Sequence, residues 1–97
     1  MTVFAVEYVY AANSTEARNE IRPAHREWSG NLAQDGVILA SGPYGDGAGA
    51  LLIFKTADEA TLNSILKQDP YAAVDVIAGI RITEWSPVIG MFAGLAA

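Results

Sequence analysis

Hydrophobic and polar residues alternate at the start of the chain, over residues 3–11. One side of this segment carries Phe4, Val6, Tyr8 and Tyr10. Because successive side chains of a β-strand point to opposite faces, this alternation predicts a strand with one face in the core.

The next pattern has the period of a helix. Proline suits the first turn of a helix and glycine commonly ends one, so we expect a helix over residues 23–35, terminated by Gly36. Residues 12–21 are polar and irregular, and we expect Ser14 to cap only a short turn there. Spacings of four, three and four define an inward stripe of Ile21, His25, Trp28 and Leu32.

Two short apolar runs, residues 37–40 and 50–54, predict strands that are buried on both faces. The segment between them, residues 41–49, is dense in turn-forming residues and is expected to be a loop that covers a neighbouring site. No Lys-Ser or Lys-Thr pair closes this loop, so it does not match a phosphate-binding Walker motif.

A second helix is expected to begin at the capping box of residues 56–59, with Thr56 as the cap, and to stop at Pro70. The last strand is expected over residues 80–85. The apolar tail of residues 88–97 is then expected to pack on a sheet edge or a partner. The inward stripe of the second helix is predicted to hold Leu62, Ile65, Leu66 and Asp69.

The order strand, helix, strand, strand, helix, strand is typical of a ferredoxin-like α+β domain, which we expect to span residues 1–97. Two helices cover one face of such a sheet. Because the middle strands are apolar on both faces, the uncovered face is expected to pack on a second copy, giving a face-to-face homodimer.

Composition narrows the range of functions. The chain has 97 residues, no cysteine and a net charge of −5, so thiol chemistry is excluded. Its six Lys and Arg residues look scattered, which argues against nucleic-acid binding. No uncharged apolar run reaches the roughly 18 residues of a membrane span. The chain starts without a basic leader, so we expect a cytoplasmic protein without a membrane anchor.

His25 is the only histidine, and Asp69 shares the inward side of the neighbouring helix. A carboxylate beside an imidazole can hold one tautomer and raise its basicity, as general acid–base catalysis requires. Two structural alternatives stay open at this point. Asp69 could instead cap a new turn that begins at Pro70, and His25 could be a core histidine with its hydrogen bonds satisfied.

Other residues give weaker indications. Ser41 could be a nucleophile, but with no second histidine to activate it a turn at Ser41-Gly42-Pro43 is favoured. One histidine among scattered acids does not form a metal-ligand set, so neither metal nor cofactor is expected. A pocket lining or ordinary core packing is open for the large aromatic residues Trp28, Tyr44, Tyr71 and Trp85.

Four short motifs in order resemble the signature series of YciI-like proteins, the YCII-related domain family. The resemblance covers about residues 1–87. These motifs are Arg22-Pro23-Ala24-His25, Asp35-Gly36, Ser41-Gly42-Pro43 and Asp69-Pro70-Tyr71.

This resemblance implies a dimeric α+β barrel of ferredoxin-like protomers, related to muconolactone isomerase. It implies that His25 and Asp69 are the active pair and that Ser41, Gly42 and Pro43 lie at the pocket. One similar branch of the family removes chloride from a chlorinated hydroxyquinol. The tail after residue 88 is longer and more apolar than the family pattern.

We therefore expect a small cofactor-independent enzyme of the lyase or isomerase type. His25 would move a proton on a small organic substrate, Asp69 would orient it, and Tyr71 and the Ser41 segment would shape the cavity. The alternative is a non-catalytic dimeric module that binds a small molecule or assists another enzyme. A purely structural dimer is a third possibility.

Overall fold

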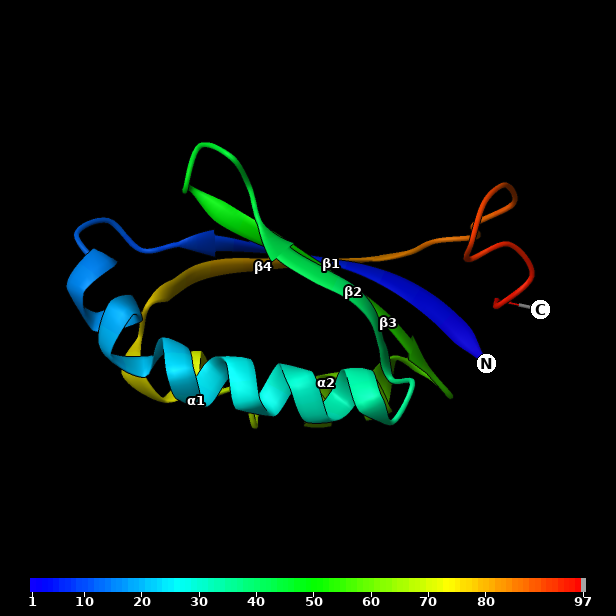
Figure 1. Ribbon diagram of the computed structural model, residues 1–97, viewed down its shortest axis with the longest axis horizontal. Coiled ribbons are helices and arrows are strands. Elements are labelled where there is room, and N and C mark those ends of the chain that lie inside the picture. The colour runs from blue at the N-terminus through cyan, green and yellow to red at the C-terminus, as the bar shows by residue number, and fades with distance from the viewer. Residues whose placement is uncertain (97) are drawn as a thin grey trace.

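The four strands form one antiparallel sheet in the order β2-β3-β1-β4, and both helices lie on the same face of it (Figure 1). The computed structural model describes residues 1–96. This arrangement confirms the predicted ferredoxin-like α+β class. The elements are β1 (Thr2–Tyr10), α1 (Thr15–Gln34), β2 (Ile38–Pro43), β3 (Gly49–Thr56), α2 (Glu59–Leu66), the 3-10 helix η1 (Pro70–Val74) and β4 (Ile77–Glu84).

The core lies between the two central strands and the helices. In the β1–β3 register Phe4 is opposite Phe54 and Val6 opposite Leu52, so all four side chains point to the helix side. Each of the four is at most 4% exposed. Full burial of a large apolar side chain contributes about 1.5–3 kcal/mol, so this alternating pattern both places and stabilises the central pair of strands.

Helix α1 begins at Thr15, eight residues before the predicted start, and Pro23 lies inside it. The prediction that residues 12–21 are irregular is therefore wrong. Proline removes one backbone donor from a helix, but in a 20-residue helix the remaining bonds and the packed face persist around it. The predicted end is confirmed, since Gly36 has a φ of +75° and Val37 N donates to the Leu32 carbonyl.

Strand β2 continues through Ser41, Gly42 and Pro43, so the predicted turn at these residues is wrong. They pair with Leu52, Leu51 and Ala50 of β3. Proline is tolerated here because β2 is an edge strand that needs no partner on its outer side.

The two strands that were predicted to be buried on both faces, β2 and β3, differ in burial. β3 is buried on both faces, as predicted, since Phe54 faces the helices and Ile53 lies on the opposite face, and both are at most 7% exposed. For β2 the prediction is wrong, since only Ile38 is buried in it; this strand lies at the sheet edge, where its outer flank is open to solvent. Gly49, which opens β3, has no room for a side chain, because a Cβ there would overlap the Tyr8 carbonyl oxygen.

The cap of α2 is Asp58, not Thr56 as predicted. Asp58 Oδ1 accepts from Thr61 N at 2.8 Å, while Thr56 Oγ1 donates to the Asp58 carbonyl at 2.9 Å. The hydroxyl therefore fixes the chain before the cap, and the carboxylate occupies the cap itself. α2 ends at Leu66, so Asp69 lies beyond the helix in the connection to η1. The predicted end of the helix at Pro70 and the place of Asp69 on its inward stripe are therefore wrong.

The last strand starts at Ile77, three residues before the predicted position, and is followed by a segment without strands or regular helix. Figure 1 shows this segment rising on the side of the sheet away from the helices. Val3 on that face and Pro87 are both buried, whereas Val88 and Ile89 are at least 77% exposed. Ala97, the last residue of the predicted tail, lies outside the described residues.

Across residues 1–96, none of the helices combines the length and the apolar character that crossing a lipid bilayer requires.

Candidate active site

His25 and Asp69, separated by 44 positions in the chain, are in direct contact. His25 Nδ1 lies 2.8 Å from Asp69 Oδ1. His25 comes from the middle of α1, and Asp69 precedes η1, which packs against α1. The prediction that these two side chains lie in contact is therefore confirmed.

The Asp69 carboxyl group is fully buried, and its oxygens accept three hydrogen bonds. Tyr8 OH donates to Oδ2 at 2.8 Å, and Tyr71 N donates to Oδ1 at 3.0 Å beside the bond from His25. Asp69 is thus the N-cap of η1 as well as the partner of His25. The sequence left open whether Asp69 caps a new turn or contacts His25, and in the structure Asp69 does both. A buried carboxylate is stable only with such partners.

This contact selects the tautomer of His25. An ionised carboxylate can only accept, so when Asp69 is ionised this hydrogen bond requires the proton on Nδ1 of His25. In the neutral ring Nε2 then holds the lone pair. The His25 side chain is 14% exposed, and that exposed part lies at a cavity. Among residues 1–96 the only hydrogen bond of the ring is the one from Nδ1, so the pair has the form of an oriented general base.

Tyr8 supports this arrangement from the sheet. Burial, and then the charge of Asp69, raise the pKa of the Tyr8 hydroxyl far above its ordinary value of 10.0. Tyr8 therefore remains a protonated donor throughout the physiological pH range. Alternation in β1 predicted that it faces inward, but nothing in the sequence indicated its hydrogen bond to Asp69.

Aromatic rings form one wall around the imidazole. Tyr71 stacks on His25 with 4.1 Å between ring centroids and 8° between planes. Tyr10 meets Tyr71 edge to face at 6.2 Å, and the Arg18 guanidinium lies 4.1 Å from the Tyr10 ring centroid. The pKa of Tyr10 is raised, mainly by burial and then by Tyr71, against the opposite effect of Arg18 and Arg22.

The cavity has a volume of about 480 Å³ and lies between α1, η1 and the β2–β3 hairpin. Volumes in this range suit small-molecule sites. The structure brings the predicted pocket residues Ser41, Gly42, Pro43 and Tyr71 to it. Its lining consists of Tyr10, Arg18, Arg22, His25, Arg26, Ser29, Ser41, Gly42, Pro43, Tyr44, Gly45, Gly47, Ala50 and Tyr71.

Of the four large aromatic residues, two line the cavity and two lie elsewhere. Tyr44 and Tyr71 line the cavity. Trp28 packs against the core with its ring 6.5 Å from that of Phe54, and Trp85 is 41% exposed and away from the lining. Tyr44 OH donates to Glu7 Oε1 at 2.8 Å, which ties the tip of the β2–β3 hairpin to β1.

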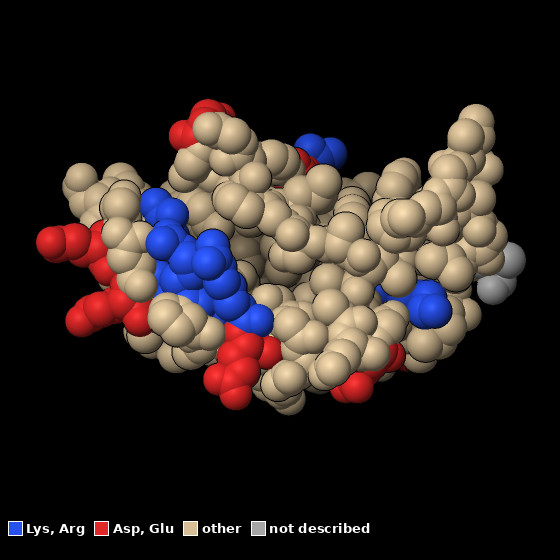
Figure 2. Space-filling view, in the orientation of Figure 1, with Lys and Arg blue, Asp and Glu red and all other residues tan. Residues whose placement is uncertain are grey.

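Arg18, Arg22 and Arg26 also line the cavity, and the sequence reading missed them. They are half of the six basic residues, so the view that these residues are scattered is wrong. Figure 2 shows Arg and Lys atoms gathered beside a hollow in the surface. The three arginines are spaced four residues apart, as residues on one side of a helix are. The first of them lies in residues 12–21, where no helix was predicted.

Within residues 1–96, no three His, Asp or Glu side chains come together in a way that could hold a metal ion. The expectation that the protein uses no metal or cofactor stays a prediction.

Comparisons with known proteins give a family and a fold. The family model described as the YCII-related domain matches residues 2–86. No protein of curated function matches the sequence.

Solved structures that resemble the chain include the following two. One is the 5-chloro-2-hydroxyhydroquinone dehydrochlorinase from Burkholderia phenoliruptrix in complex with 2,5-dihydroxybenzoquinone, with a TM-score of 0.77 and 20% identity over 87% of this chain and 93% of that chain. The other is described as an antibiotic biosynthesis monooxygenase from Bacteroides thetaiotaomicron, with a TM-score of 0.55 and 17% identity over 91% of this chain and 90% of that chain. At these identities the likeness concerns the fold.

Proposed function

Because this chain belongs to the YCII-related domain family, we propose that it is a small enzyme of the lyase or isomerase type that works without a cofactor. The observation that carries the proposal is the His25–Asp69 contact at a cavity. Asp69 is buried and held by three donors, while His25 reaches the cavity wall. An imidazole that is held by a carboxylate and lines a cavity has the arrangement that general acid–base catalysis needs.

In the proposed reaction His25 Nε2 takes a proton from an acidic O–H or C–H of the substrate. Asp69 keeps the ring oriented through Nδ1–H and stabilises the imidazolium that forms. The electron pair of the broken bond moves into the substrate. The proton then returns to another substrate atom, which is an isomerisation, or a leaving group departs with the electron pair, which is an elimination.

The substrate is proposed to be a small planar organic molecule. His25 and Tyr71 place aromatic rings at the cavity wall, and Ser41, Gly42 and Pro43 are the proposed contacts on the β2 side. The similar dehydrochlorinase was solved with 2,5-dihydroxybenzoquinone, a planar ring that a cavity of about 480 Å³ can contain.

We further propose that the protein is a homodimer formed through the sheet face that the helices leave free. Val9 on this face is 56% exposed. A second hollow of about 290 Å³ on the β2–β3 part of the sheet is lined by apolar side chains that include Leu51 and Ile53. An apolar sheet face of this kind is stabilised when a second copy covers it.

The proposed function is tested with the variants His25→Gln and Asp69→Asn on a panel of hydroxyquinols and unsaturated lactones, followed by NMR in D₂O. The wild-type protein is expected to convert at least one compound or exchange its protons. His25→Gln should slow this by roughly 10²–10⁴-fold, the usual contribution of a positioned acid–base group. Asp69→Asn should also slow it, because the ring loses its oriented partner.

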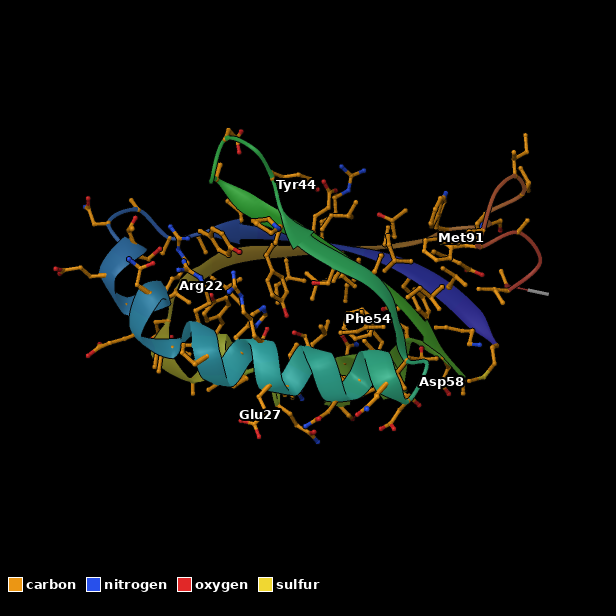
Figure 3. The ribbon with its side chains drawn as sticks, viewed as in Figure 1. Arg22, Glu27, Tyr44, Phe54, Asp58 and Met91 are labelled. Carbon is orange, nitrogen blue, oxygen red and sulfur yellow. The ribbon has the colours of Figure 1, made fainter. Side chains whose placement is uncertain are left out.

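Glu27→Gln is the matched control on the same helix. Glu27 points away from the sheet in Figure 3, and this variant should keep wild-type rates. If a compound binds in the cavity and returns unchanged, with His25→Gln indistinguishable from the wild type, the protein is a binding module and not an enzyme.

A further inference from the structure

Three guanidinium groups face one cavity from a single helix. Arg18, Arg22 and Arg26 lie at i, i+4 and i+8 of α1, and positions spaced by four share one side of a helix. In Figure 3 Arg22 lies between α1 and the sheet, on the side from which His25 also reaches the cavity. His25 is three residues after Arg22, so a rise of about 4.5 Å, a little less than one helical turn, separates them along the axis.

No carboxylate neutralises these charges. The chain has eleven acidic residues against six basic ones, yet the cavity lining contains none of the acids. Within residues 1–96 none of the three arginines forms an ion pair with an Asp or Glu carboxylate. Three cations without a carboxylate partner favour a negatively charged group in the cavity.

The three arginines differ in how they are held. Arg18 donates to the hydroxyl oxygens of Ser14 at 3.0 Å and Thr15 at 3.3 Å, and it lies over the Tyr10 ring. These partners are neutral, so they orient the guanidinium without cancelling its charge. Arg22 and Arg26 donate to no side chain or carbonyl group among residues 1–96. Their donors are free for a ligand that enters the cavity.

We propose that the cavity takes a small planar organic anion, either a carboxylate or an ionised enol or phenol. Its charged oxygens bind Arg22 and Arg26, and its ring lies beside His25. This inference rests on the proposed function, since it names the substrate class of the same site. The aromatic wall of Tyr10 and Tyr71 favours a flat organic anion over inorganic phosphate.

The same cations would serve the reaction. When His25 takes a proton, negative charge grows on the substrate. Arginines that already line the cavity stabilise that charge with little reorganisation. Arg22 is a positioning residue for the anion in the ground state and an electrostatic stabiliser as the proton leaves.

The test compares benzoate with benzamide, which has the same size and shape but no charge. Binding is followed by NMR through the His25 ring and the arginine side-chain signals. Benzoate should bind roughly ten- to a hundredfold more tightly than benzamide, and more weakly as salt is added. Arg22→Gln should remove most of that preference and leave benzamide binding unchanged.

Lys67→Gln is the control, because it removes an equal charge at an exposed residue that does not line the cavity. Arg26→Gln is a second variant in case Arg22→Gln folds poorly, which the dispersion of its amide spectrum reveals. The inference is overturned if benzoate and benzamide bind equally, if neither binds, if both arginine variants match the wild type, or if phosphate binds as tightly as benzoate.

His25→Gln separates this inference from the proposed function. It should still bind benzoate, because the charge recognition does not involve the imidazole. Intact benzoate selectivity together with turnover that is indifferent to His25→Gln would refute the proton-transfer mechanism and leave anion binding standing. If the selectivity for benzoate is absent while turnover still depends on His25, the proposed anion recognition is refuted and the proton-transfer mechanism stands.

Discussion

At the scale of single residues, the site depends on one buried acceptor. Asp69 takes one hydrogen bond from each of three parts of the fold: Tyr8 in β1, His25 in α1 and the backbone of Tyr71 in η1. Within residues 1–96, no buried side-chain nitrogen or oxygen lacks a hydrogen-bond partner. A fully satisfied buried network orients its members strongly, since loss of one partner leaves another polar atom unpaired without water.

Tyr8→Phe tests this network. It leaves Asp69 Oδ2 buried without its donor, so the free energy of unfolding should fall by about 1–3 kcal/mol. Urea denaturation measures the change. The matched control is Tyr10→Phe, which removes a hydroxyl from a partly exposed ring that keeps its contact with Arg18, and it should change stability much less. Equal effects of the two substitutions would contradict the special role of the Tyr8 hydroxyl.

The tautomer of His25 can be read directly, because the sequence contains no other histidine. Long-range ¹H–¹⁵N NMR should show the proton of the neutral ring on Nδ1 and a lone pair on Nε2. In Asp69→Asn the fixed tautomer should give way to a mixture, since the amide can donate as well as accept. A neutral wild-type ring protonated on Nε2 would contradict the proposed role of that nitrogen as the base.

At the scale of elements, α1 does the most for the site. One helix carries His25 and the three cavity arginines, and its stripe also places Trp28 and Leu32 on the core. Its side toward the sheet is therefore partly functional and partly structural. Since His25 and the three arginines come from one helix, helical geometry fixes the relative positions of their Cα atoms.

Pro23 interrupts the hydrogen bonds of this helix. Pro23→Ala restores a backbone donor at an interior position and should raise the free energy of unfolding by roughly 1–3 kcal/mol. Urea denaturation and helical circular dichroism check this. Pro70→Ala is the control, because Pro70 occupies the start of η1, where proline fits, and no gain is expected there. A loss of stability in Pro23→Ala would show that the interrupted helix is the better packed one.

The cap of α2 makes stability depend on pH. The backbone hydrogen bond from Thr61 lowers the pKa of Asp58 below its ordinary value of 3.8. A group whose pKa is lower in the folded state stabilises the fold above its unfolded-state pKa, and this contribution is lost as the pH falls through the folded-state value. Asp58→Asn keeps an acceptor but removes the charge. Its deficit relative to the wild type should be present at neutral pH and vanish in strong acid. A deficit that stays constant across urea denaturation curves at both pH values would contradict this.

At the scale of the whole molecule, the sheet has two unequal faces. One carries both helices and the core, and the other carries Val9, Leu51 and Ile53 with no helix over them. The segment after β4 rises at one end of this face only (Figure 1). The remaining part is the surface on which the proposed homodimer depends.

Light scattering during size-exclusion chromatography tests the dimer. The wild type at micromolar concentration should have twice the mass of one chain. Val9→Glu places a charge on the free face and should give the single-chain mass. Val74→Glu, an exposed valine of η1 on the helix side, should leave the dimer intact. A wild-type protein with the mass of one chain would show that the free face needs no partner.

Much of the fold could be predicted from short-range patterns. Alternation placed Phe4, Val6 and Tyr8 on the inner face of β1, and helical spacing placed His25 on the inner face of α1. These predictions succeeded because a strand or helix that buries one face must show its period in the sequence. The errors at Ser41-Gly42-Pro43 and at the start of α1 share one cause. Proline and glycine signals are local, and pairing with β3 or packing on the sheet outweighed them.

What the sequence by itself determined is the order of the elements, their inward faces and the two residues, His25 and Asp69, that are suited to acid–base chemistry. Only the tertiary structure decided that Tyr8 completes their network, that Asp69 serves as both cap and partner, and that three arginines face one hollow. The physical reason is the sequence separation over which each interaction acts. Periodicity and capping act over a few residues, whereas a hydrogen bond between positions 8 and 69 exists only after the sheet and the helices have packed together.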